Sequence, residues 1–252
     1  MGTIEFNVAD GIATITLNNP DMHNAVDAPM RGGLDQAYAT IEQDAAIRVA
    51  IIHGAGDKAF CSGGFIDGYL EGKAFGPGGS GPPPIPRPWP ATKPYIAAIN
   101  GFALAGGFAL ALACDLRVAG RSARMGPTGL KRGAVQGAQT IQRLTRLVGA
   151  SKALEILLVS KYLSGVEAEA CGLAMLADDD KVLETAQIAA RTIADFSPWT
   201  VAQTKKLVYE AQHLPLDEAI AREEKVAAEG YRRDDALEGF LAFSERRKPN
   251  FR

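Results

Sequence analysis

The sequence predicts an α/β fold made of stacked ββα units. Short apolar runs typical of strands alternate with helical patterns, and glycine-bearing turns join them. Such an alternation favours parallel pairing between successive strands. The last fifty residues show helical patterns only. We therefore expect a ββα core over residues 1–195 and a helical region over 196–252.

The first quarter of the chain contains a predicted hairpin, a helix and a buried strand. Residues 4–8 and 12–17 alternate between apolar and polar, and Ala9-Asp10-Gly11 separates them as a turn signal. From Val26 apolar residues recur every three or four positions, which indicates a helix with one buried face. Residues 49–53 then form a short apolar run, and a glycine-bearing turn, AFCSGG, occupies 59–64.

The stretch over residues 94–120 is the most informative one for function. An apolar run from Tyr95 to Asn100 predicts a strand, Gly101, Gly106 and Gly107 follow, and residues 108–114 have a helical composition. A strand, a glycine turn and a helix start leave unpaired backbone N–H groups that can bind negative charge. A tight connection inside a buried core would give the same pattern, so the glycines alone do not decide.

A proline-rich segment over 76–94 precedes this stretch. Eight of the fourteen prolines fall within it, so no helix can run through it. A flexible linker is the plain alternative. A mere spacer does not need large apolar side chains such as Ile85 and Trp89, and we interpret the segment as an active-site loop.

The second half of the chain is predicted to be mostly helical. Ser164 and Glu167 have the spacing of a capping box. Leu237, Phe240 and Leu241 give the final helix an apolar face that favours packing on another subunit. The predicted helices cover residues 137–148, 151–160, 181–196, 200–211, 216–230 and 234–245.

Composition excludes several classes of function. A net charge of −2 provides no basic field for nucleic acid or an anionic membrane. The longest apolar run, over 108–114, is too short to span a bilayer, and the first residues do not have the pattern of a signal peptide. Three cysteines without metal or disulfide spacing fit a reducing compartment. We expect a cytoplasmic protein that holds no metal.

Five blocks of sequence resemble the enoyl-CoA hydratase/isomerase (crotonase) superfamily in order and nearly in spacing. The resemblance implies a spiral of ββα turns with a C-terminal helical trimerisation region, assembled as a homotrimer or hexamer. It also implies an acyl-CoA substrate, with coenzyme A entering as part of the thioester and no permanently bound cofactor. The blocks are ITLNNPDMHNAV, AFCSGG, YIAAINGFALAGGFALALACDLRVA, QRLTRLVGASKALEILL and EGFLAFSERRKPNF.

By the same resemblance, the backbone N–H groups of Gly64 and Gly106 bind the thioester oxygen. Negative charge develops on this oxygen during reaction, and preorganised donors stabilise it. Lys248 is mapped near a neighbouring subunit's CoA phosphates, although a solvated tail lysine is the better explanation. The CoA moiety is expected along two segments, which contain His23 and Ala25 in the first and Ser62, Gly63, Phe65 and Ile66 in the second.

The chain departs from the family pattern at its acid–base positions. Hydratases of this family carry two glutamates, at positions that correspond to Ala109 and Thr128 here, and an isomerase acid maps to Gly137. None of these side chains exchanges a proton near neutral pH. Asp67 and Glu71 follow the first glycine turn at helical spacing and are the remaining candidate bases, although a helix cap for Asp67 and a solvated side chain for Glu71 are the simpler roles.

Residues 127–133 are similar to those of the dihydroxynaphthoyl-CoA synthase branch, whose aspartate maps to Gln136. We expect Trp89, Ala109 and Gln136 to line the acyl pocket. Three functions stay open at this point: a hydratase or isomerase that stabilises a thioester enolate, a carbon–carbon bond-forming (Dieckmann-type) or thioester-hydrolysing CoA enzyme, and a non-catalytic acyl-CoA binder.

Overall fold

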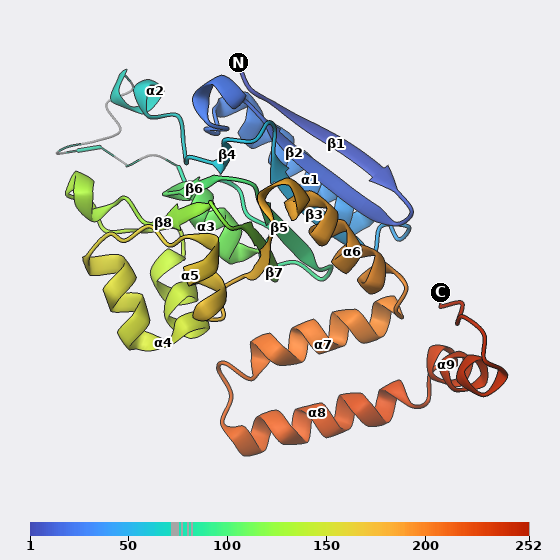
Figure 1. Cartoon of the computed structure of the whole chain (residues 1–252). Helices are drawn as coiled ribbons and strands as arrows, with labels where there is room; N and C mark the ends of the chain where they lie inside the picture. The colour runs from blue at the N-terminus through green and yellow to red at the C-terminus, as the bar shows by residue number, and fades with distance from the viewer. Residues whose placement is uncertain (72–75, 77, 80, 82, 252) are drawn as a thin grey trace.

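Two sheets form the core of the computed structural model, which describes residues 1–71, 76, 78–79, 81 and 83–251, without the side chains of 67–69 (Figure 1). The larger sheet has the order β1-β2-β3-β5-β7-β9, and the smaller sheet has the order β4-β6-β8. Only β1 and β2 pair in antiparallel fashion among these strands. The strands are β1 Thr3–Ala9, β2 Ile12–Asn18, β3 Val49–Gly54, β4 Ala59–Cys61, β5 Tyr95–Ile99, β6 Phe102–Leu104, β7 Leu116–Gly120, β8 Arg124–Gly126 and β9 Met175–Ala177.

The chain alternates between the two sheets, and this confirms the predicted ββα repeat. β3, β5 and β7 lie in the larger sheet, and each is followed directly by a strand of the smaller one. A helix then closes each unit. The closing helices are α2 Ile66–Glu71, α3 Gly106–Ala113 and, after a short 3-10 turn, α4 Thr140–Leu158.

The central strands are apolar on both faces because both faces are covered. In β3, Ala50 and Ile52 pack into the main core with α1 and α3, whereas Val49 and Ile51 pack against α6. This is why the strand reads as a continuous apolar run rather than an alternating one. The helices around the sheets are α1 Ala28–Gln43, α5 Gly165–Ala170 and α6 Val182–Ala194.

The C-terminal helices lie away from the sheets (Figure 1). Helix α7 is tied to the core at Asp115, whose carboxylate accepts hydrogen bonds from Lys205 Nζ and Tyr209 OH, both at 2.9 Å. The three predicted helices are confirmed as α7 Pro198–Glu210, α8 Leu216–Gly230 and α9 Asp234–Glu245. The division of the chain at residue 196 stays a prediction.

Three local predictions, a capping box, a helix break and a glycine turn, had different outcomes. The predicted capping box forms, because Ser164 Oγ accepts from Glu167 N–H and the Glu167 carboxylate accepts from Ser164 N–H. The predicted break at Gly149 is a kink inside α4, where this residue has a φ of 76°. The single turn expected between Asn100 and Gly106 was wrong, because β6 lies there. In the described part of the chain, no helix is long and apolar enough to cross a membrane.

Candidate active site

Three candidate residues follow the carboxyl ends of the three strands of the smaller sheet. These strands are parallel, with Cys61 opposite Ala103 and Leu104 opposite Gly126, and the pairing of β4 with β6 shifts register between Ala59 and Cys61. Gly64 follows β4, Gly106 follows β6 and Thr128 follows β8. Carboxyl ends of parallel strands meet at one edge, which is where α/β proteins bind ligands. The fold therefore brings together residues that are far apart in the sequence.

The two glycine turns pack main chain against main chain. A Cβ atom at Gly107 would lie 2.0 Å from Cys61 O, and one at Gly63 would lie 3.4 Å from Gly106 N. Gly63 also has a φ of 118°, which side chains rarely permit. The glycines are therefore required for the approach of the turns.

The N–H groups of Gly64 and Gly106 are available at this contact. Neighbouring groups hold the first turn, because Val26 N–H donates to Gly63 O at 2.8 Å and Phe65 N–H donates to Val26 O at 3.1 Å. Gly106 is the first residue of α3, and first-turn N–H groups have no acceptor within their helix. Among the described residues, neither glycine N–H has a hydrogen-bond acceptor.

Ala105 sets the orientation of the Gly106 N–H. It has a φ of 52° and a ψ of −116°, a conformation rare for a residue with a side chain. Such a backbone costs on the order of 1–3 kcal/mol and persists only where its surroundings enforce it. Ala105 N–H donates to Gly126 O at 3.2 Å and thereby fixes the turn to β8. Sequence reasoning placed the unusual backbone at the glycines and missed this alanine.

Two of the residues expected along CoA, His23 and Ser62, are joined by a main-chain hydrogen bond next to the first turn. Ser62 N–H donates to His23 O at 3.0 Å, and Ser62 Oγ donates to Met22 O at 3.2 Å. Ala25 is buried beside them. His23 has a left-handed φ of 51°, and its ring meets Phe102 edge-on with centroids 5.9 Å apart.

Asn24 fixes the turn that contains His23 and Ala25, and sequence reasoning missed this residue. Its fully buried amide donates to Ala55 O and Ala59 O, and its Oδ1 accepts from Asn19 N–H. The signal was present in the sequence, because asparagine tolerates the left-handed backbone, with a φ of 54°, that this turn needs.

The structure gives less information on four further predicted residues. Phe65 is half-buried, and Ile66 is exposed at the start of α2. The side chain of Asp67 lies outside the described residues. Lys248 Nζ forms an exposed ion pair with Asp195 at 2.8 Å. Their assigned roles stay predictions.

The positions of the missing glutamates are buried. Ala109 lies on α3 one turn beyond Gly106, and Thr128 follows β8; their exposed fractions are 1% and 6%. Gln136 Oε1 accepts from the N–H groups of Thr128 and Gly129 at 3.1 and 3.0 Å. The Gln136 side chain therefore holds the loop after β8, and its contact with substrate stays a prediction.

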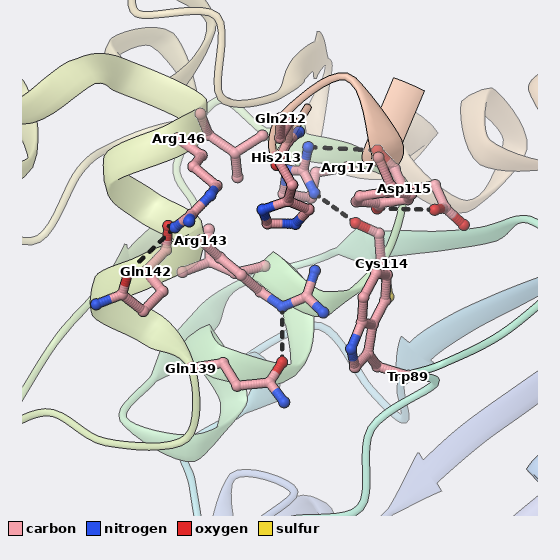
Figure 2. A pocket seen from close by; sticks show the side chains of 13 residues that line it. Trp89, Cys114, Asp115, Arg117, Gln139, Gln142, Arg143, Arg146, Gln212 and His213 are labelled. Carbon is pink, nitrogen blue, oxygen red and sulfur yellow. Dashed lines mark hydrogen bonds between the residues drawn. The ribbon is translucent and has the colours of Figure 1, made fainter. Parts of the chain in front are cut away.

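The proline-rich segment reaches the glycine turn through Ile85. This side chain is buried, and its Cδ1 would lie 2.7 Å from a Cβ atom at Gly106. The segment continues to Trp89, whose ring lies edge-on to Tyr209 with centroids 4.9 Å apart. Trp89 borders a cavity of about 280 Å³ at the carboxyl end of α3 (Figure 2).

The cysteines near these elements are not activated nucleophiles. Burial raises the pKa of the Cys61 thiol to about 12, and it does the same for Cys114. Thiols with such pKa values stay protonated at neutral pH. Among the residues that the structure describes, no three His, Cys, Asp or Glu side chains gather as a metal site would require.

Comparison with known proteins identifies the family. The chain is 34% identical to (E)-benzylidenesuccinyl-CoA hydratase of Thauera aromatica, over 99% of this chain and 98% of that protein. It is 31% identical to a short-chain-enoyl-CoA hydratase of Clostridium acetobutylicum, over 94% and 92% of the two chains. The crystal structure of an enoyl-CoA hydratase from Mycobacterium tuberculosis H37Rv superposes with a TM-score of 0.88, at 34% identity, and covers 99% of this chain and 98% of that one. Because the family's own sequence profile also matches residues 7–252, the chain belongs to the enoyl-CoA hydratase/isomerase family within the crotonase superfamily.

Proposed function

We propose that this enzyme binds an acyl-CoA thioester and stabilises negative charge on its carbonyl oxygen with the N–H groups of Gly64 and Gly106. The observation that carries the proposal is the packing of two glycine turns in which the N–H groups of Gly64 and Gly106 have no acceptor in the described part of the protein. Donors fixed by the fold need no reorganisation when an enolate or tetrahedral oxygen forms, so they lower its free energy.

The CoA moiety lies along the surface made by residues 22–25 and 62–66. Two hydrogen bonds between Ser62 and residues 22–23 support a fixed arrangement before the ligand arrives.

The residues at positions 109 and 128 favour a reaction other than hydration at the same oxygen site. Alanine and threonine supply no proton acceptor near neutral pH, so hydration by two glutamates has no counterpart here. Carbon–carbon bond chemistry and thioester hydrolysis use the same stabilised oxygen with a different base. A protein that binds acyl-CoA without turnover is the remaining alternative.

Binding of acyl-CoA is expected to raise the melting temperature. A ligand that binds only the folded state at 100 times its Kd adds about 2.7 kcal/mol of stability. For a chain of this size, this corresponds to roughly 5 °C or more. Thermal unfolding with octanoyl-CoA measures the shift, and octanoylcarnitine, which lacks the CoA moiety, is the control. Equal shifts with both compounds, or none with either, would contradict the proposal.

We further propose that the chain assembles as a homotrimer or a pair of trimers through α7, α8 and α9. A cavity of about 780 Å³ opens between these helices, and its lining includes Trp199, Phe240 and Phe243. The exposed fractions of Phe240 and Phe243 are 63% and 85%. Apolar surface of this kind favours burial against a partner.

Light scattering is therefore expected to give the mass of three or six chains. Phe240→Asp should shift this mass toward the monomer, because a buried unpaired carboxylate is costly. Val8→Asp places the same charge on β1, at an exposed apolar residue far from these helices in the chain, and should leave the mass unchanged. A monomeric wild-type protein at micromolar concentration would refute the assembly.

A further inference from the structure

The cavity at the carboxyl end of α3 is lined by Arg117, Arg143 and Arg146 and by the acid Asp115 (Figure 2). Arg143 Nε donates to Gln139 Oε1 at 3.0 Å, and Arg146 Nη1 donates to Gln142 Oε1 at 3.1 Å. Both acceptors are neutral amides. Within the described ranges, neither arginine forms an ion pair.

The acid that borders the cavity is already engaged. Asp115 forms an ion pair with Lys205 at 2.9 Å and also accepts from Tyr209 OH and Tyr95 N–H. Arg117 is buried behind it and donates to main-chain carbonyls, including Cys114 O at 2.7 Å. The Asp115 carboxylate is therefore paired with Lys205. Among the described residues, the guanidinium groups of Arg117 and Arg143 form no ion pair.

Arg87 adds a further uncompensated cation close by. Arg87 is half-buried and its Nη1 donates to Ile85 O at 3.2 Å, whereas its Nε atom is buried and has no hydrogen-bond partner among the described residues. Burial and the neighbouring charge of Arg143 lower the pKa of Arg87. Buried cations are normally paired, because an unpaired charge away from water is costly. An anion beside Arg87 and Arg143 would remove this cost.

Arg143 is held in place as a ligand-binding residue would be. Its guanidinium stacks over the Trp89 ring at 4.4 Å from the centroid, and Figure 2 shows it extending from α4 toward this ring. Ala138 and Gln139 both have left-handed φ angles, of 56° and 65°, and this backbone brings Gln139 to Arg143. A fixed guanidinium can bind both oxygens of a carboxylate.

The cavity lies at the far end of the helix that begins at the glycine turn. Leu112 lines it, six residues beyond Gly106, which is about 9 Å along the helix axis. The proline-rich segment covers the same distance, since Ile85 packs on Gly106 and Trp89 borders the cavity. Helix α3 and the proline-rich segment therefore both lead from the proposed oxygen site to the cavity that Arg143 lines.

We propose, resting on the function proposed above, that this cavity binds a carboxylate at the distal end of the acyl group. The substrate class is then the CoA monothioester of a medium-length dicarboxylic acid. Arg143 is the specificity-determining residue, and Arg87 contributes to the positive potential around it. Trp89 and Tyr209 form the aromatic wall.

The test compares two acyl-CoA thioesters of equal length by calorimetry: octanoyl-CoA and the mono-CoA thioester of octanedioic acid. A charge-assisted hydrogen bond predicts that the wild type binds the carboxylated ligand about tenfold more tightly, or better. Arg143→Gln should remove this preference, because it weakens binding of the carboxylated ligand far more than binding of octanoyl-CoA. Arg143→Lys should retain part of it. Arg191→Gln removes an exposed charge on α6 and should retain all of it.

Equal affinity of the wild type for the two ligands would overturn the carboxylate site and leave the CoA proposal intact. Arg143→Gln that weakens both ligands equally would also overturn it, because Arg143 would then act on the fold. Failure of both ligands to bind the wild type would remove the proposed function together with this inference. Thermal unfolding of each variant shows whether it is folded.

Discussion

Gly106→Pro is expected to lower the fraction of bound acetoacetyl-CoA that is present as the enolate. Proline has no N–H group, so the thioester oxygen loses one of its two proposed donors. One such donor is worth roughly 10²–10³-fold in enzymes where it has been removed. We expect the equilibrium constant for enolate formation on the protein to fall by about 10²-fold. The enolate absorbs ultraviolet light differently from the keto form, so the measurement does not require turnover.

Gly106→Ala is the matched control, because it keeps the N–H group. Its Cβ atom would meet Ile85 Cδ1, the end of a flexible side chain that can move aside. A proline restricts the backbone conformation of the residue before it, which is Ala105 here. Thermal unfolding must therefore show that the proline variant is folded. If the folded proline variant formed as much enolate as the alanine variant, Gly106 would not be a donor to the oxygen.

The sequence predicted two parts of the fold: strands that are buried on both faces, and helices whose apolar pattern repeats over several turns. The central strands are buried on both faces, so β3 and β5 appear as unbroken apolar runs. Helices α8 and α9 begin and end at the predicted residues, because their polar and apolar positions repeat over many turns. Ser164 and Glu167 form a short motif with a direct physical cause, and it was also predicted.

The smaller sheet was not predicted, because its strands are too short. β4, β6 and β8 have three residues each, which is less than two periods of an alternating pattern. Their pairing nevertheless positions the site, since it brings Gly64, Gly106 and Thr128 to one edge. The family resemblance supplied the pairing of the two glycines. The residues alone indicated only two separate turns.

The arginine cavity could not have been found from spacing. Trp89, Arg117, Arg143 and Tyr209 come from four separate elements, and tertiary packing alone brings them together. Each is ordinary in its local sequence. Only the ion pairs of the folded protein reveal that Asp115 is engaged and that Arg143 has no acid partner among the residues that the structure describes.

Wild-type protein is expected to hydrate crotonyl-CoA orders of magnitude more slowly than a relative with two glutamates. Hydration requires a water molecule that loses a proton as it attacks Cβ. It also requires a proton donor at Cα. A positioned acid–base group contributes roughly 10²–10⁴-fold. Ala109 and Thr128 provide neither group, so the oxygen site and binding alone remain. Loss of the enoyl-thioester absorbance with purified protein measures the rate.

Ala109→Glu combined with Thr128→Glu is expected to raise this rate above either single change, because the two carboxylates act on one water. The hydrogen bonds that Gln136 makes to the 128–129 turn use main-chain N–H groups, so they survive replacement of the Thr128 side chain. The matched control is the double glutamine variant, which has nearly the same shape without an ionisable group. It should not gain activity.

Burial sets the limit of this rescue. Both positions are almost fully buried, and burial raises the pKa of a carboxyl group, so the rescue should grow with pH as the carboxylate that accepts the proton ionises and fall again once the proton donor ionises. A glutamine variant as active as the glutamate variant would show that shape, not proton transfer, produced the gain. Wild-type hydration as fast as that of two-glutamate enzymes would be the more serious result. Another group, with Asp67 as the first candidate, would then supply the base, and the interpretation of positions 109 and 128 as catalytically inactive would be wrong.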